Sequence, residues 1–202
     1  MAISLNTKLK ATGGEAPFFN EALPHPGYIA GKYYLPDHMF ASVTSGNTVA
    51  DQIYFMPFVP RETHTFDRLA LANTGAGDAG DKCRLGIYTA GADGLPDSRV
   101  VDGGEIVFGG AAALNTVTIS QSLSANTLYW LCAVFDAIVT VLKTDISVAS
   151  TPMISNYGLE TTRINVSMMG AILESHAYAA LPAFSGGTFT ATTDYPTVLL
   201  RG

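Results

Sequence analysis

The chain contains 202 residues, of which 48% are hydrophobic and 14% are charged, and its formal net charge is −6. This composition excludes an intrinsically disordered protein, which needs low hydrophobicity and high charge. It also argues against nucleic-acid binding, because 11 Lys and Arg residues offer too little positive charge to neutralise a phosphate backbone. A chain of this length can bury about 70% of its unfolded surface and so form one core without disulfides or metals. The low share of charge is a first hint that a partner covers part of the surface.

The first 26 residues differ from the rest of the chain and predict an extended arm. They are rich in Gly, Asn, Pro and Lys, and they end in Leu23-Pro24-His25-Pro26, where two prolines favour extended backbone. The adjacent Phe18 and Phe19 predict an anchor through which the arm docks and serves assembly, although a floppy tail fits the composition equally well. Residues 1–14 lack the continuous apolar run of a signal peptide, so none is expected.

From Gly27 onward, short apolar runs alternate with turns at intervals of about 8 to 12 residues, as in antiparallel β-proteins. The runs predicted to be strands are 28–34, 49–58, 64–73, 82–89, 105–108, 114–121, 127–136, 138–143, 165–169 and 196–200. The longest stretch without charge, 106–135, is interrupted by Gly, Asn, Thr, Ser and Gln. We therefore expect strands there rather than a membrane helix, which needs about 20 mainly apolar residues, and we predict no membrane insertion.

The run 114–121 shows how the faces of these strands are expected to divide. Leu114, Val117 and Ile119 are expected to mark its apolar face. The opposite face is predicted to carry the hydroxyl side chains Thr116, Thr118 and Ser120. This polar face is rich in hydroxyls rather than in charges.

Turns and the absence of helical periodicity define the fold class. Gly-rich and Pro-containing turns are predicted at 74–81 and 93–98, and 168–176 (MMGAILESH) is the one place where a short helix is expected. The order of elements shows no alternation of strands and helices. We predict an all-β protein: an antiparallel β-sandwich, jelly-roll-like, that forms a single domain over 27–202 behind the extended N-terminal arm 1–26.

The two cysteines, Cys83 and Cys132, lie in apolar runs that are predicted to be strands, CRLGIY and LYWLCAVF. Free cysteine in such a run behaves as a small buried hydrophobe, so two core thiols are expected. A disulfide between adjacent strands stays open as an alternative. A catalytic thiol is disfavoured because no histidine stands near either cysteine in the sequence.

The sequence offers no strong metal or cofactor motif. The histidines have no HxH or HExxH spacing; they are His25, His38, His64 and His176. The turn that holds Asp78 and Asp81 lacks the spacing and the closing glutamate of a calcium loop, so solvated aspartates explain it better. A GxGxxG match at 75–80 precedes a strand instead of a helix. We therefore predict neither metal nor cofactor.

Catalytic patterns are also missing. Glycoside hydrolysis needs two carboxyl groups about 5 to 9 Å apart. Glu160, Glu174 and Asp194 lie in the C-terminal third, but no pattern nominates a pair among them. The sequence contains no GxSxG elbow and no P-loop. We predict no catalytic residues and a protein that is not an enzyme.

Aromatic side chains are the remaining candidates for a binding site. Tyr28, Tyr33, Tyr34 and Tyr54 are the candidate contacts to a glycan or to a protein partner, because exposed rings can stack on sugar faces or fill a partner's pocket. The alternative for each tyrosine is that its ring fills the core of the sandwich. Trp130, in the most apolar run, is expected in the core.

Several segments together resemble a β-sandwich module of tailed-bacteriophage virion structural proteins, of the tail-fibre, minor tail or decoration type. The segments are IYFMPFVPR (53–61), TFDRL (65–69), RLGIY (84–88), DGLPDS (93–98), VDGG (101–104), ISQSL (119–123), LYWLCAV (128–134) and YPTVLLR (195–201). The resemblance covers about residues 28–202. It rests mainly on turn and core signals, which specify a fold better than a role.

The resemblance implies a virion surface module, often found at the end of tail-fibre or minor tail polypeptides, and it brings no catalytic residues. Here an arm rather than a long fibrous shaft precedes the module, so attachment is expected through the arm or through a face of the sandwich. The expected partners are copies of the chain, as a trimer, and other virion proteins. The chain is expected to be made in the host cytoplasm and to reside on the particle.

Three roles follow, in order of preference. The first is a tail-fibre or tail-tip component that contributes to recognition of host-surface polysaccharide. The second is a capsid decoration (cement) protein that stabilises the head. The third is a carbohydrate-active enzyme or a carbohydrate-binding module.

Overall fold

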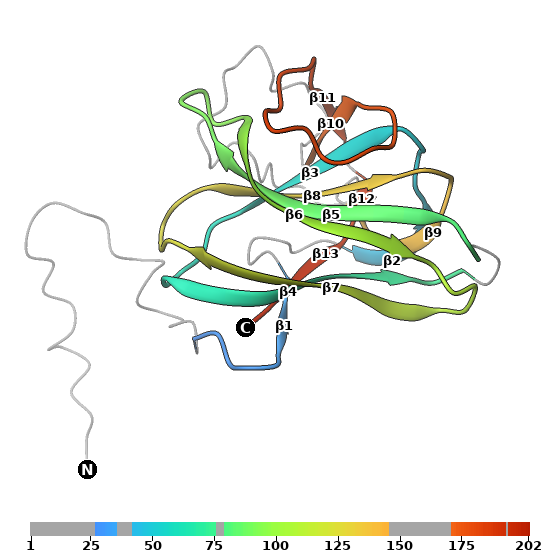
Figure 1. The fold of residues 1–202 in the computed structure, drawn as a ribbon, viewed down its shortest axis with the longest axis horizontal. Coiled ribbons are helices and arrows are strands. Elements are labelled where there is room, and N and C mark those ends of the chain that lie inside the picture. Colours follow the sequence, from blue (N-terminus) through green and yellow to red (C-terminus); the bar gives the residue numbers. More distant parts are fainter. Residues whose placement is uncertain (1–26, 36–41, 76–78, 146–170, 193) are drawn as a thin grey trace, which may run out of the picture.

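The computed structural model of the chain describes residues 27–35, 42–75, 79–145, 171–192 and 194–202. These residues form two antiparallel sheets that lie face to face (Figure 1). The predicted all-β antiparallel sandwich is thereby confirmed. The jelly-roll connection, the single domain over 27–202 and the arm 1–26 stay predictions.

Within the described residues, the two sheets contain thirteen strands. Their bounds are β1 Tyr33–Tyr34, β2 Ser42–Asn47, β3 Gln52–Phe58, β4 His64–Asn73, β5 Lys82–Ala90, β6 Pro96–Val107, β7 Ala113–Leu123, β8 Tyr129–Phe135, β9 Thr140–Asp145, β10 Ala171–Ser175, β11 Thr190–Thr192, β12 Asp194–Pro196 and β13 Val198–Arg201. The first sheet has the order β1-β13-β4-β9-β12, with β7 also paired to β4 and β2 also paired to β9. The second sheet has the order β11-β10-β3-β8-β5-β6.

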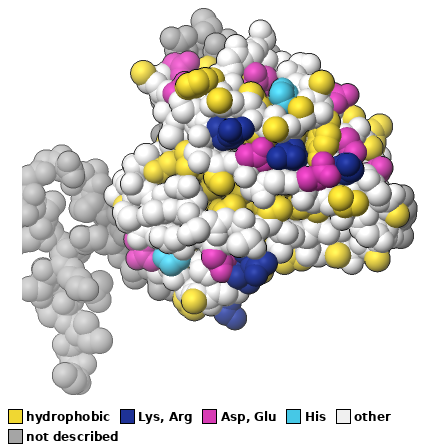
Figure 2. Space-filling model, viewed as in Figure 1, with side chains coloured by type: hydrophobic (Ala, Val, Ile, Leu, Met, Phe, Trp, Pro, Cys, Tyr) yellow, Lys and Arg dark blue, Asp and Glu magenta, His cyan; other side chains and the backbone are white. Residues whose placement is uncertain are grey.

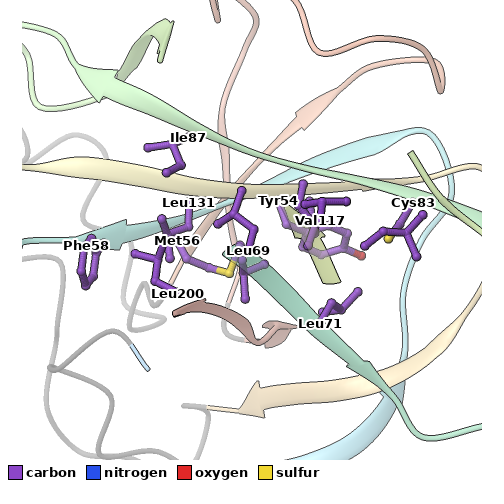
Figure 3. Packing of buried hydrophobic residues seen from close by; sticks show 14 of the residues in the cluster. Tyr54, Met56, Phe58, Leu69, Leu71, Cys83, Ile87, Val117, Leu131 and Leu200 are labelled. Carbon is purple, nitrogen blue, oxygen red and sulfur yellow. The ribbon is translucent and has the colours of Figure 1, made fainter. Parts of the chain in front are cut away.

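The main core lies between the two sheets (Figure 3). Alternate residues of β3, β5 and β8 point toward it from the second sheet, and alternate residues of β4, β7 and β13 meet them from the first. Buried examples from the two sheets are Met56, Leu131, Leu69 and Leu200. This core follows from the period-2 alternation of apolar residues in the strands.

The second sheet is buried on its outer face as well. All seven residues of β8 are buried, because Trp130, Cys132 and Val134 point away from the main core into a second apolar cluster. The other strands of this sheet add Ile53, Phe55, Tyr88 and Ile172. A strand buried on both faces reads as a continuous apolar run, which explains the sequence YWLCAVF.

Residues 176–189, here named the cover segment, close the second cluster. They connect β10 to β11 at the top of Figure 1 and pack Tyr178, Leu181 and Phe189 against the sheet. Three carboxylates of the sandwich accept hydrogen bonds from the cover segment: Asp51 from the N–H of Tyr178 (2.7 Å), Asp102 from the N–H of Leu181 (3.1 Å), and Glu174 from the hydroxyl of Ser185 (2.6 Å) and the N–H of Gly187 (2.8 Å).

Some predicted elements differ from the structure. The helix expected at 168–176 is wrong where the structure describes it, because Ala171–Ser175 is strand β10. Its alternate residues fill the two clusters, Ala171 and Leu173 on one side and Ile172 on the other, and this packing overrides helix propensity. The predicted strand 165–169 lies outside the described residues.

Two boundaries moved for local reasons. The run 28–34 is a strand only at Tyr33–Tyr34, because residues 29–32 make a turn in which Gly31 has φ +76°. Strand β6 starts at Pro96 instead of 105, since its charged residues obscured the apolar pattern.

On β7, the prediction that Leu114 belongs to the apolar face is wrong. Leu114 is 44% exposed, because residues 114 and 117 are an odd number of positions apart and therefore point to opposite faces of the strand.

Cys83 and Cys132 are free and fully buried, which confirms the expectation of two core thiols. They lie on the neighbouring strands β5 and β8 but on opposite faces of the sheet, Cys83 in the main core and Cys132 in the second cluster. Burial raises the pKa of both thiols, so the reactive thiolate is suppressed.

We predict that neither cysteine of the native protein reacts with a thiol reagent at pH 8, and that both react once the chain is unfolded in urea. The measurement is the rate of Ellman's reagent consumption with and without denaturant. The Cys132→Ser variant is the control, since it should lower the thiol count of the unfolded chain by one. Rapid labelling of the native protein would contradict the burial of the two thiols.

We also predict that Glu174→Ala destabilises the fold by about 1–3 kcal/mol, because it leaves the Ser185 hydroxyl and the Gly187 N–H without their acceptor. Glu174→Gln, which keeps one acceptor oxygen, should lose less. Urea unfolding measures both, with Ser175→Ala, an exposed neighbour on the same strand, as the control. Equal stability of Glu174→Ala and the wild type would show that Glu174 does not hold the cover segment.

Candidate interaction surface

The structure separates the four candidate tyrosines into two classes. Tyr54 is 2% exposed and Tyr28 is 8% exposed, whereas Tyr33 and Tyr34, which form β1, are half-buried. The prediction of an open contact is therefore wrong for Tyr28 and Tyr54, whose rings fill the core, the alternative that the sequence left open. Tyr33 and Tyr34 keep part of their surface for a partner.

Tyr54 is buried because it alternates with Met56 and Phe58 on the inner face of β3. Its ring meets Phe135 edge-on at a centroid distance of 6.1 Å. Its hydroxyl accepts a hydrogen bond from the N–H of Val49 at 2.8 Å, which satisfies the polar end of the side chain. Burial raises the pKa of this phenol. The spacing Tyr54, Met56, Phe58 was the signal in the sequence that places Tyr54 in the core.

Tyr28 joins the chain entry to the sandwich through a cluster of rings. Its ring lies edge-on to Tyr34 at 5.0 Å and to Phe66 at 4.9 Å, and it contacts His64 at 5.1 Å. Its backbone N–H donates to a carboxylate oxygen of Glu62 at 2.9 Å. The hydroxyl of Tyr34 accepts a 2.6 Å hydrogen bond from the N–H of Ile29, which closes the loop before β1. These contacts fix the position at which the chain enters the fold.

Arg201 of β13 positions Tyr33. Its guanidinium lies 5.9 Å from the centroid of the Tyr33 ring, close enough for a cation–π contact. The same guanidinium donates two hydrogen bonds to the carboxylate of Asp67 on β4, one of them at 2.7 Å. These two hydrogen bonds, here named the Arg201–Asp67 fork, lower the pKa of Asp67 and raise the pKa of Arg201. One side chain thereby ties β1, β13 and β4 together.

We name residues 27–35 together with Arg201 the arm-base surface, because this stretch directly follows residues 1–26. Ile29 and Leu35 are 54% and 41% exposed, beside the half-buried Tyr33 and Tyr34. The exposed chemistry is thus aliphatic side chains, partial rings and two cations, Lys32 and Arg201. Such a mixture suits contact with a protein surface better than stacking on a sugar. The predicted arm anchor, Phe18 and Phe19, lies outside the described residues.

The carboxylates considered for hydrolysis have structural partners where the structure describes them. Glu174 holds the cover segment, and Asp194 accepts a 2.6 Å hydrogen bond from the ammonium of Lys143. Glu160 lies outside the described residues, as does Asp78 of the acidic turn. Among the described residues, no group of three or more His, Cys, Asp or Glu side chains is placed to hold a metal ion. The same residues include no helix long and apolar enough to cross a membrane.

Phe184 was not among the predicted site residues. Its ring is 69% exposed, on the part of the cover segment that bridges to Ser98 of β6. It sits in LPAFSGG, a stretch without strand or helix periodicity. The one feature of the sequence that could have identified Phe184 as exposed is its position as a large aromatic residue among small ones.

Comparison with known proteins adds no assignment: the sequence matches no family model and no curated protein.

We predict that Arg201→Ala returns the pKa of Asp67 toward the ordinary value of 3.8, since Arg201 is the largest cause of its lowering. A carboxylate with a lowered pKa stabilises the fold above the ordinary pKa, and that contribution disappears as the pH falls through the lowered value. The stability difference between wild type and Arg201→Ala should therefore be present at neutral pH and vanish in acid.

The measurement is the carboxyl NMR titration of Asp67, supported by thermal unfolding at each pH. Lys32→Ala removes a cation of the same surface that does not contact Asp67, and it should leave the titration unchanged. An unshifted pKa in Arg201→Ala would contradict the role given to the fork.

Proposed function

We propose that this chain is a non-enzymatic structural protein of a bacteriophage particle, mounted through the arm-base surface and the residues that precede it. The phage assignment is supported by the resemblance of residues 28–202 to virion modules. The observation that carries the mounting role is the arm-base surface, with Ile29 and Leu35 exposed beside the rings of β1. Exposed aliphatic side chains next to a fixed chain entry are suited to a protein contact.

A tail-fibre or tail-tip position is the first candidate. In that role the protein would contribute to recognition of a host-surface polysaccharide, which needs ring faces that a sugar can reach. Tyr33, held beside Arg201, is the residue that best meets this requirement among the four tyrosines. Trimeric assembly is proposed with this role.

A capsid decoration position is the second candidate, and the burial of Tyr28 and Tyr54 favours it, because it removes two of the four rings from any sugar-binding surface. A decoration protein needs a contact to capsid proteins, and the aliphatic part of the arm-base surface fits that need. The third candidate, a carbohydrate-active enzyme or binding module, is weakened because Glu174 and Asp194 are already engaged in internal contacts.

Immunogold labelling of intact virions with an antibody against this chain tests the proposal. Label at the tail end supports the fibre or tip role and overturns decoration, and label over the head does the reverse. Particles without label would overturn the virion assignment as a whole.

The mounting surface is tested with Ile29→Glu/Leu35→Glu. Two carboxylates on an apolar contact carry a desolvation cost, so we predict at least about tenfold less of this variant in purified particles. The control is Ile138→Glu, which changes a 63% exposed aliphatic residue elsewhere. Equal incorporation of all three proteins would exclude the arm-base surface as the contact.

A further inference from the structure

Strand β7 is a long edge strand whose first half lacks the usual protection, since the irregularity in its pairing with β4 lies beyond Thr118. It has 11 residues, and among the strands that the structure describes only β4 pairs with it. Its sequence, ALNTVTISQSL, contains no charged residue and no proline. An edge strand of this kind offers a row of backbone N–H and C=O groups to another strand, and natural proteins normally block it with charge, proline, bulges or short length.

The other edges of the sandwich carry such protection. β1, β11 and β12 have only two or three residues each. β2 has six and includes Gly46. β6 is long, but its pairing with β5 has three irregularities, and the Phe184 bridge covers its start. It also carries the charges Asp97, Arg99, Asp102 and Glu105. The regular first half of β7, which contains neither charge nor proline, therefore differs from every other described edge.

Strand β6 approaches β7 without pairing to it. Gly103 of β6 lies so close to β7 that a Cβ atom there would be 2.6 Å from a methyl group of Val117. Val117 points into the main core, so the contact is made on the inner side of β7. The side of the sandwich is thus closed by packing rather than by hydrogen bonds, and the backbone edge of β7 keeps no strand partner among the described residues.

We propose that β7 pairs antiparallel with β7 of a second copy of this chain, across a two-fold axis. The pairing would involve Leu114–Thr118, because the ladder of β7 with β4 is regular there and becomes irregular only beyond Thr118. The two sheets of the pair would join into one continuous sheet. A two-fold pair differs from the trimer proposed with the tail-fibre role, so the mass of the wild type distinguishes the two arrangements.

Charge argues for a second copy as the partner. A two-fold axis sets each side chain against the same strand of the other copy, so any charge on β7 would meet a like charge close by. β7 itself has none, although each chain carries a formal net charge of −6. One cation reaches it from the neighbouring strand, since Arg68 of β4 donates to the hydroxyl of Thr116 at 3.4 Å. Figure 2 shows the contrast: charged side chains gather in a row over β5 and β6, and the strip below that row is white and yellow.

The exposed side chains of β7 fit the same arrangement. Leu114, 44% exposed, and Thr118 lie on the outer face with Thr116 between them. In a register centred on Thr116, Leu114 of one copy lies opposite Thr118 of the other, an aliphatic side chain against a methyl group. The pair would remove the exposed leucine from water.

The test compares the wild type with Leu114→Lys/Thr118→Lys and with Leu114→Glu/Thr118→Glu by sedimentation equilibrium. The wild type should have about twice the 21.3 kDa mass of the chain. Each variant alone should dimerise at least about tenfold more weakly, because like charges face one another, and an equimolar mixture of the two should restore the dimer. Val49→Lys/Ala92→Lys, which places two lysines on exposed residues elsewhere, should behave as the wild type.

Hydrogen exchange of the wild type supplies an independent readout, since the amides of 114–118 that do not donate to β4 should gain protection as the protein concentration rises. Thermal unfolding confirms that each variant is folded. A wild type that stays monomeric up to about 100 μM, or variants that keep the wild-type mass, would overturn the proposal. A trimer unaffected by the β7 substitutions would overturn it too, since the contact would then lie elsewhere.

Discussion

The burial of the second sheet on both faces is the constraint on which the rest of this structure depends. Every residue of β8 is buried, so the outer face of its sheet needs a cover as much as its inner face needs the opposing sheet. Residues 176–189 supply that cover, but they lack a regular strand or helix that would satisfy their own backbone groups. Asp51, Asp102 and Glu174 therefore act as acceptors for the cover segment, and the close approach of Glu174 to Gly187 leaves no room for a side chain there. Hydrogen bonds to three carboxylates thus hold the cover segment against the second apolar cluster.

This constraint explains which parts of the fold the sequence could predict. Strands such as β4, whose bounds match the expected run 64–73, could be predicted because the alternation of apolar and polar residues and the flanking turns are local signals. The apolar run of β8 placed Trp130 in the core correctly. The position of the cover segment could not be predicted, because most of its hydrogen-bond acceptors are distant in the sequence. Asp102 on β6 and Asp51 before β3 lie more than fifty residues away in the chain, and only Glu174 on β10 is a sequence neighbour. For the same reason residues 171–175 form a strand although their local pattern favoured a helix.

The low content of charge also has a structural meaning. Several of the few charged residues form ion pairs with one another within the chain: Arg84 pairs with Asp102, Lys143 with Asp194, Lys82 with Glu105 and Arg201 with Asp67. Lys143 is itself buried and also donates to the carbonyl of Asn47 at 2.7 Å. The surface that remains is poorer in free charge than the composition alone indicates. Of the candidate site, the sequence could identify the tyrosines, and the apolar run of β3 indicated the burial of Tyr54. The burial of Tyr28 depends on rings of β1 and β4 that no local pattern brings together.

The two contacts proposed for this chain lie on the same sheet and can operate together. Along the first sheet the order is β1, β13, β4 and β7, so the arm-base surface and the β7 edge are separated by only two strands. At about 4.8 Å between neighbouring strands, the two edges stand about 14 Å apart. Arg201 on β13 and Asp67 on β4 join the intervening strands by a charged hydrogen-bonded fork. A partner bound at β1 would therefore leave β7 accessible to a second copy, while the cover segment keeps the outer face of the other sheet closed. Both proposed contacts thus lie on the first sheet, whereas the cover segment lies on the second, and this division follows from the positions of the charged residues and of the cover segment.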